Sequence, residues 1–219
     1  MLYIKTFIFN PISVNTYVLY DETREAVIID PGNYVEAENQ ELQTFVETEN
    51  LNIKYILNTH PHVDHVLGND YCKHHFAGPL LMHDAGLSIY KHAVHYCVAF
   101  GIDFDRFPVA DRYYSQDEEI RFGNHRLQVL YTPGHTDGSV SLFEPEEKIL
   151  FTGDLLFKGS IGRTDLPTGD YGTALRSIKE KILPLPEATV LYPGHGPTST
   201  LQIEKLTNSY LLENYDDKQ

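Results

Sequence analysis

The chain has 219 residues and a formal net charge of −14, and its 42% hydrophobic and 22% charged residues are typical of a globular protein. The acidic balance argues against nucleic acid or an anionic membrane as partner, because both bind clustered lysine and arginine. No apolar run approaches the roughly 18 residues that span a bilayer, and the N-terminal segment MLYIKTFIFNPISVNTY lacks the features of a signal peptide. We therefore expect a cytoplasmic protein with a single domain over 1–219.

The N-terminal half is predicted to alternate strands and helices. Enrichment in β-branched and aromatic residues predicts strands at 2–9, 15–21, 25–30, 53–59 and 79–82. Apolar residues at helical spacing predict helices at 34–50, 64–76 and 84–100, and a loop is expected at 101–117.

The C-terminal half repeats this organisation. Strands are expected within 118–131, around a Gly123-Asn124 turn, and at 140–144, 148–154 and 188–194. Helices are expected at 168–183, with Asp170 as cap, and at 201–213. Hairpins in both halves imply antiparallel pairing, which argues against a wholly parallel doubly wound sheet. The pattern predicts an α/β fold in which two mixed sheets pack face to face with helices outside, a four-layer αββα sandwich.

The motif THPHVDH at 59–65 directly follows a predicted buried strand. It places three imidazoles and one carboxylate within six residues, and these are ligands preferred by zinc and neighbouring transition metals. Mutual repulsion should depress the pKa of clustered histidines and leave neutral nitrogens free to coordinate. The motif therefore predicts a metal site.

Three later segments, which lead to His135, Asp154 and His195, share one local arrangement. In each, a predicted strand is followed by a glycine turn and a potential ligand. Strand ends at a sheet edge are where α/β proteins usually build their sites. The complete set of candidate metal ligands is His60, His62, Asp64, His65, His135, Asp154 and His195.

The remaining histidines and both cysteines lack this arrangement. Cys72 and Cys97 form no CxxC pair and are expected to be buried thiols in helices. The histidines expected not to bind metal are His74, His75, His83, His92, His95 and His125.

The ordered motifs THPHVDH, PGHT, TGD and PGHG resemble the metallo-β-lactamase superfamily over nearly the whole chain. Within it, FTGDLLFKGSIGRTDLPTGD resembles the branch of glyoxalase II-like hydrolases (hydroxyacylglutathione hydrolases) and persulfide dioxygenases, in which a GRTD stretch follows the metal-binding aspartate. Zinc β-lactamases often use a cysteine ligand. Neither cysteine here lies in a ligand motif, which argues against antibiotic hydrolysis.

The resemblance implies two divalent metal ions, zinc in the first instance with iron or manganese as alternatives. It places His60, His62 and His135 on the first ion, and Asp64, His65 and His195 on the second. Asp154 would bridge them, and Asp64 and Asp154 would be the catalytic carboxylates. Two divalent ions, two carboxylates and one hydroxide leave about one positive charge for an anionic transition state.

Two further residues have open alternatives. Asp30 matches an acidic position that the family commonly shows near the metals, so it either hydrogen-bonds a ligand or only forms an Asp-Pro-Gly turn. Arg163 stands near a basic residue with which glyoxalase II holds a glutathione carboxylate. The alternative is a structural ion pair with Asp165 or Asp170.

The leading hypothesis is hydrolysis of a small hydroxyacyl thioester, such as a glutathione conjugate. Only about 24 residues follow His195, so we expect a short C-terminal helix at 201–213 and no separate glutathione-binding helical domain of the kind that true glyoxalase II carries. The alternatives are a persulfide dioxygenase with one iron on His60, His135 and Asp154, and a metal-binding module without catalysis. The expected partner is a small molecule, without nucleic acid or membrane, and a homodimer is left open.

Overall fold

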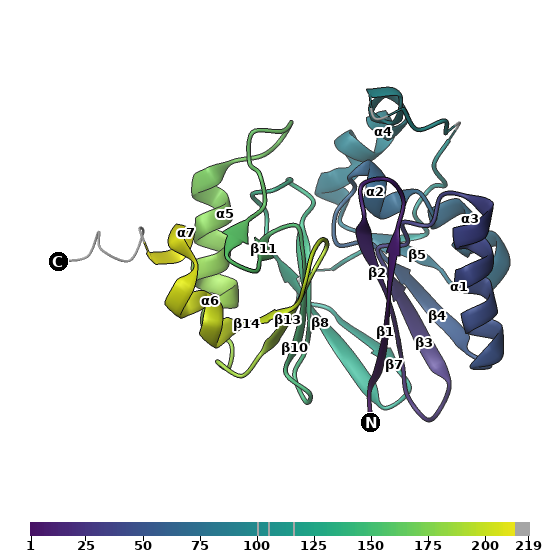
Figure 1. The fold of residues 1–219 in the computed structure, drawn as a ribbon, viewed down its shortest axis with the longest axis horizontal. Helices are drawn as coiled ribbons and strands as arrows, with labels where there is room; N and C mark the ends of the chain where they lie inside the picture. The colour runs from purple at the N-terminus through teal and green to yellow at the C-terminus, as the bar shows by residue number, and fades with distance from the viewer. Residues whose placement is uncertain (100, 105, 116, 213–219) are drawn as a thin grey trace.

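Two six-stranded sheets pack face to face and carry helices on both outer faces (Figure 1). This computed structural model describes residues 1–99, 101–104, 106–115 and 117–212. The layers confirm the expected αββα sandwich of two mixed sheets.

The first sheet comes from the N-terminal half. Its strands, in spatial order, are β1 (Tyr3–Phe9), β2 (Val14–Tyr20), β3 (Glu25–Ile29), β4 (Asn52–Leu57), β5 (Leu80–Met82) and β6 (Arg112–Tyr113). Neighbours pair antiparallel from β1 to β3 and parallel from β3 to β6. Helices α1 (Glu36–Thr48) and α3 (Asn69–Phe76) cover its outer face through a shared cluster that includes Leu42, Ile56 and Cys72.

The second sheet comes from the C-terminal half. Its strands, in spatial order, are β14 (Ser199–Thr200), β13 (Val190–Pro193), β10 (Ile149–Gly153), β9 (Val140–Glu144), β8 (His125–Tyr131) and β7 (Glu119–Phe122). Only β10 and β13 pair in parallel. Its outer face is covered by α5 (Tyr171–Ser177) with the π-helical turn Ile178–Ile182, and by α6 (Leu201–Thr207) and α7 (Ser209–Leu212).

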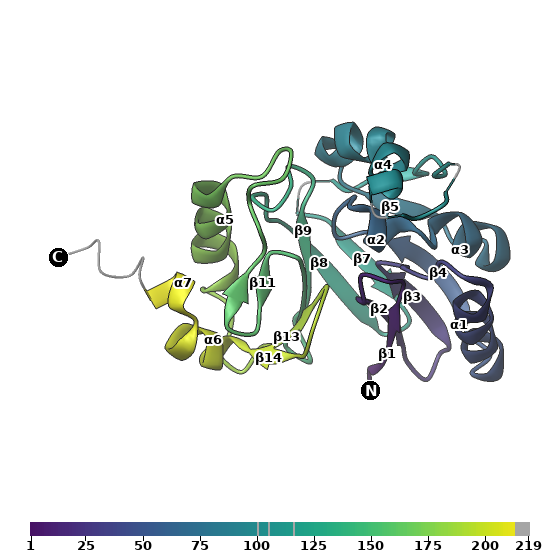
Figure 2. The ribbon, with the colours of Figure 1, turned by 45° about the horizontal axis from the view of Figure 1, so that its top comes forward.

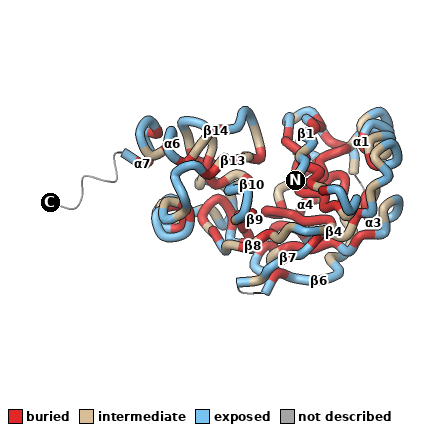
Figure 3. The backbone as a smooth tube through the Cα atoms, turned by 90° about the horizontal axis from the view of Figure 1, so that it is seen from below, coloured by how far each residue is buried: buried red, intermediate tan, exposed pale blue. Residues whose placement is uncertain are grey.

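The main core lies between the sheets. Leu19, Ile29 and Leu57 from the first sheet belong to one buried cluster with Phe122 and Leu142 from the second. Figure 3 shows buried residues along the inner strands and many exposed residues on the outer helices. Each such side chain contributes about 1.5–3 kcal/mol when it is removed from water, so this layer holds the two halves together.

The prediction of a single helix over 64–76 is wrong, because this segment forms two helices, α2 (Val63–Val66) and α3. The break is at Gly68, whose amide donates to the Pro31 carbonyl at 2.8 Å instead of continuing the helix. A Cβ on Gly68 would lie 2.0 Å from Asn33 Oδ1, so close packing against Asn33 requires glycine here.

Three other segments differ from expectation. The predicted loop at 101–117 contains β6, and a short hairpin, β11 (Leu156–Phe157) and β12 (Ser160–Ile161), follows Asp154. The segment 201–213 forms two helices separated at Asn208, and residue 213 lies outside the described residues. Asn208 Oδ1 accepts from the Tyr210 amide at 3.2 Å, so this side chain competes with helical hydrogen bonding.

The helix predicted over 84–100 starts as a 3₁₀ turn at Asp84–Gly86 and continues as α4 (Leu87–Ala99). Residue 100 lies outside the described residues. None of the helices in the described ranges is long and apolar enough to cross a bilayer.

One edge of the sandwich collects the ends of the strands that precede the predicted ligands. Strands β8, β10 and β13 run in the same direction, because β9 is antiparallel to both of its neighbours and β13 is parallel to β10. Val14 forms an isolated bridge with His195, which ties this edge of the second sheet to the first. Figure 2 brings the edge forward and shows α2 and α4 beside it.

Candidate metal centre

All seven predicted ligands meet at this edge, between the two sheets. His60, His62, Asp64 and His65 lie on the segment that leaves β4 and enters α2. His135, Asp154 and His195 follow β8, β10 and β13, as the strand-and-turn motifs predicted. The residues form two groups of three side chains with one carboxylate between them.

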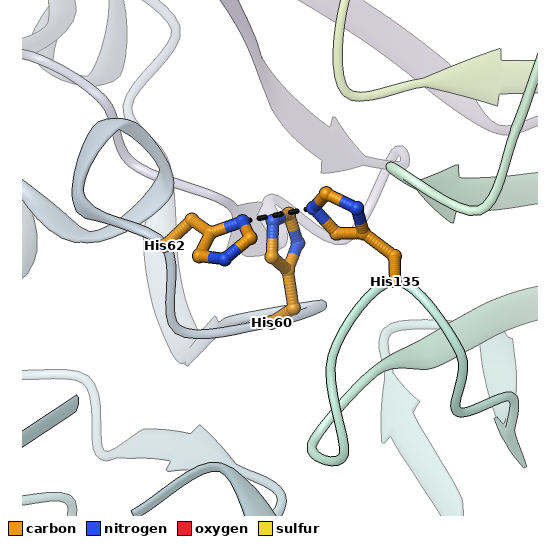
Figure 4. Close-up of side chains that lie close together, drawn as sticks. All are labelled: His60, His62 and His135. Carbon is orange, nitrogen blue, oxygen red and sulfur yellow. Dashed lines mark hydrogen bonds between the residues drawn. The ribbon is translucent and has the colours of Figure 1, made fainter. Parts of the chain in front are cut away.

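The triple-histidine group consists of His60, His62 and His135, whose ligand atoms lie within 4.8 Å of one another. Figure 4 shows the three rings converging, with His135 Nε2 at 2.8 Å from His62 Nδ1. His60 Nε2 is buried and has no hydrogen-bond partner among the described residues. A buried imidazole nitrogen without a partner is costly, and a metal ion would satisfy it.

The Asp64 group consists of Asp64, His65 and His195, again within 4.8 Å. Asp64 Oδ2 lies 3.0 Å from His195 Nε2 and 3.5 Å from His65 Nε2. His65 is fully buried and Asp64 is nearly so. Two imidazoles and one carboxylate form a donor set suited to zinc or iron.

Asp154 contacts both groups. Its Oδ1 lies 3.3 Å from His65 Nε2, and its Oδ2 lies 3.6 Å from His195 Nε2 and 3.7 Å from His135 Nε2. Oδ1 has no hydrogen-bond partner in the part of the chain that the structure describes. The arrangement leaves one carboxylate able to serve two ions.

Two glycines make room for side chains of the site, Gly153 for Thr59 and Gly194 for Asp154. Gly153 has φ +50°, and a Cβ there would lie 2.5 Å from Thr59 Oγ1. A Cβ on Gly194 would lie 2.1 Å from Asp154 Oδ1. The glycines of the TGD and PGHG motifs are therefore required by close approach as well as by the turns.

The other nitrogen of four histidines is held by oxygen. His135 Nδ1 donates to the Arg163 carbonyl at 2.7 Å, and His195 Nδ1 to the Ser13 carbonyl at 3.1 Å. A carbonyl can only accept, so both rings carry the proton on Nδ1 and turn an unprotonated Nε2 inward when neutral. The chain thus selects the tautomer that coordination requires.

Asp30 helps to hold Nδ1 of two further histidines, His65 directly and His60 through Thr59. Its carboxylate lies 2.9 Å from His65 Nδ1 and accepts from the Thr59 amide and hydroxyl at 2.7 and 2.6 Å. Since the Thr59 hydroxyl donates to Asp30, its oxygen is free to accept from His60 Nδ1 at 3.1 Å. Asp30 also has φ +50°, so the turn and the hydrogen bond, two alternatives in the sequence, are both present.

The two groups have opposite electrostatics. Burial, and then repulsion from neighbouring histidines, lowers the pKa of His60 well below its usual value and that of His62 to about 3. Burial also lowers the pKa of His65, but Asp64, Asp154 and Asp30 outweigh it and hold that pKa well above the usual value. The pKa of His195 is likewise raised despite burial, chiefly by its hydrogen bond to Asp64. The expectation that repulsion lowers the pKa of the histidines clustered in the 59–65 motif is therefore wrong for His65.

Six other histidines and both cysteines were expected not to bind metal. None of His74, His75, His83, His92, His95 and His125 belongs to a potential metal-binding group among the described residues. His125 instead pairs with the buried Glu144 at 3.0 Å. Cys72 of α3 belongs to the buried cluster between the helices and the first sheet, and Cys97 belongs to a cluster with Val63 and Leu67.

A pocket of about 550 Å³ opens above the two groups. Its floor contains His62, Asp64, His135, Asp154 and His195, and its walls are apolar. Arg163 lines it, with 61% of its side chain exposed, and forms two hydrogen bonds of 2.8 Å to Asp165. The ion pair considered as an alternative for Arg163 is thus present.

The family model described as the metallo-beta-lactamase superfamily matches residues 9–195. The chain belongs to this superfamily. It is 36% identical over 200 residues to the hydroxyacylglutathione hydrolase GloC of Haemophilus influenzae, covering 90% of this chain and 92% of GloC. It is 32% identical to the mitochondrial persulfide dioxygenase ETHE1 of Mus musculus, covering 90% of this chain and 70% of ETHE1. The branch suggested by the GRTD stretch is confirmed.

Solved structures agree with the fold. The chain superposes on the BLEG-1 B3 metallo-beta-lactamase with a TM-score of 0.83 at 37% identity, covering 96% of this chain and 99% of that one. It superposes on TTHA1623 in a di-iron-bound form with a TM-score of 0.84 at 34% identity, covering 95% and 100%.

Proposed function

We propose that this chain is a dinuclear metal-dependent hydrolase that cleaves a small hydroxyacyl thioester. The observation that carries this proposal is the position of Asp154 between two complete groups. The triple-histidine group would hold one divalent ion and the Asp64 group the other, with Asp154 shared. Zinc is the first choice, and iron and manganese are alternatives with the same donor preferences.

Two ions held here would lower the pKa of a bound water and polarise a carbonyl. Asp64 and Asp154, which both line the pocket, would orient that water. Both pKa values are lowered, because the adjacent His65 outweighs the effect of burial, so both carboxylates are ionised at neutral pH. Hydrolysis forms a carbon–oxygen bond and breaks the carbon–sulfur bond. The thiolate leaves with the electron pair, and the water's protons pass to the thiolate and to solvent.

Arg163 is a candidate for contacting a carboxylate of the substrate. Its guanidinium would have to exchange Asp165 for the substrate, and both side chains are exposed enough to move. A small-molecule substrate, a cytoplasmic location and the absence of nucleic acid as partner stay predictions, and a homodimer stays open.

The second candidate function is persulfide oxidation with one iron on His60, His135 and Asp154. Similarity to ETHE1 favours it, whereas the complete Asp64 group favours two ions.

The test compares zinc- and iron-loaded protein. We expect about two metal ions per chain by elemental analysis and cleavage of D-lactoyl-glutathione, monitored by thiol release. Oxygen uptake with glutathione persulfide by a one-iron form, without thioester cleavage, would favour the dioxygenase. Hydrolysis of a β-lactam in preference to every thioester would reassign the substrate class, and full metal binding without any turnover would indicate a binding module.

A further inference from the structure

The pocket above the metal groups has two apolar walls. Ile12, Val63 and Tyr96 line one side, from the N-terminal half of the chain. Phe157, Leu166 and Pro167 line the other, from the C-terminal half. Ligand pockets of this size are usually apolar with a few polar groups that orient the ligand. Here the polar groups are concentrated on the floor, in the metal groups themselves.

The apolar surface begins directly at the floor. Val63 lies between His62 and Asp64 in the chain, and all three line the pocket. The ring of Phe157 lies 6.4 Å from the ring of His195, measured between centroids. A carbonyl group bound at the floor would therefore place its substituent against hydrocarbon at once.

The walls offer few partners for a charged substituent. Arg163 is the single lysine or arginine among the residues that line the described pocket, and its Nε and Nη2 already donate to both oxygens of Asp165. Removing a charged acyl substituent from water without a partner is costly. Hydrocarbon against these walls meets no such penalty.

We infer that this pocket binds an apolar acyl group, so that the best substrates are thioesters of medium-length aliphatic or aromatic acids. The inference rests on the proposed thioester hydrolysis, and it changes the preferred acyl group from a small hydroxyacyl group to an apolar one. Each buried methylene is worth about 0.8 kcal/mol, so kcat/KM should rise about three- to fourfold per added methylene until the pocket is filled.

The experiment uses metal-loaded protein and N-acetylcysteamine thioesters from acetyl to octanoyl, with benzoyl and D-lactoyl-glutathione for comparison. Calorimetry with the matching non-hydrolysable S-alkyl thioethers measures binding separately from turnover. We expect affinity and kcat/KM to rise together with chain length, with a negative heat-capacity change of binding.

Two pairs of variants locate the effect. Ile12→Thr and Leu166→Ser alter half-buried wall residues in loops and should flatten the chain-length dependence at least threefold. Their controls, Ile8→Thr and Leu206→Ser, make the same changes at side chains that are 68% and 69% exposed elsewhere. These controls should keep the wild-type dependence.

Turnover and thioether binding that are both independent of chain length would overturn the inference and leave hydrolysis standing. The same flattening in the control variants would also overturn it. Absence of cleavage across the whole series would overturn the proposed function alone, because thioether binding would still measure the preference of the walls.

Discussion

The triple-histidine group and the Asp64 group use the same side chain in opposite settings. His60 and His62 face other imidazoles in a buried space and resist protonation. His65, buried just as deeply, lies among Asp30, Asp64 and Asp154 and retains a proton strongly in the absence of metal. The difference shows that the placement of carboxylates, rather than burial, decides the charge of each group. The first group presents a neutral donor set, whereas the second supplies its own negative charge.

Removing the carboxylate that the groups share should have the largest effect. Asp154→Ala should reduce kcat/KM by about 1,000-fold and leave fewer than two ions per chain, because each group loses a ligand. Elemental analysis and steady-state kinetics measure both effects. His74→Ala, which changes an exposed histidine outside both groups, is the control. Equal damage from the two substitutions would refute the assignment of the site.

The opposite pKa shifts of His62 and His65 predict a pH effect on the stability of the metal-free protein. The unfolded chain protonates His62 below about pH 6.5, whereas the folded chain does so only near pH 3. Falling pH therefore favours unfolding in this window, by about 1.4 kcal/mol per pH unit from this residue. His65 acts in the opposite sense, since its raised pKa gives stabilisation that is complete at low pH and is lost as pH rises through the folded value.

His62→Gln isolates the first of these effects. Urea unfolding of metal-free protein between pH 7 and 4.5 should show that the variant loses less stability on acidification than the wild type does. Parallel curves for the two proteins would contradict the low pKa of His62.

Asp30→Asn tests how far one carboxylate supports both groups. Losing its charge weakens the hold on His65 directly and on His60 through Thr59. We expect metal affinity to fall about 10- to 100-fold, measured by competition with a chelator. Asp165→Asn removes an exposed carboxylate and should leave affinity unchanged. Loss at a single ion only would show that the Thr59 link to the triple-histidine group is weak.

The smallest effect is expected from Glu204, which lies outside both groups. Its buried carboxylate accepts from the Gly159 amide at 2.8 Å, from Asn208 Nδ2 at 2.9 Å and from the Ser199 hydroxyl, which joins α6 to the β11–β12 hairpin. Glu204→Gln should cost about 1 kcal/mol of stability with both ions retained. Loss of metal in this variant would mean that the hairpin positions Asp154.

Short-range patterns in the sequence predicted the seven candidate ligands and the two mixed sheets. HxHxDH, PGH and TGD are local patterns, in which a strand, a glycine turn and a ligand follow one another within a few residues. The Phe122-to-His125 turn and the Asp170 cap were also predictable, because turn and cap preferences act over two to four residues.

Tertiary structure alone decided what depends on distant backbone and on packing. The partners of His135 and His195 are carbonyls of Arg163 and Ser13, and a carbonyl has no residue-specific signal. Strands β6, β11 and β12 contain two residues each, too few for a periodicity. The break at Gly68 depends on Asn33, and the raised pKa of His65 depends on carboxylates from three separate segments. Local sequence specified which atoms can bind metal, and the packing of the two halves specified their spacing, tautomer and charge.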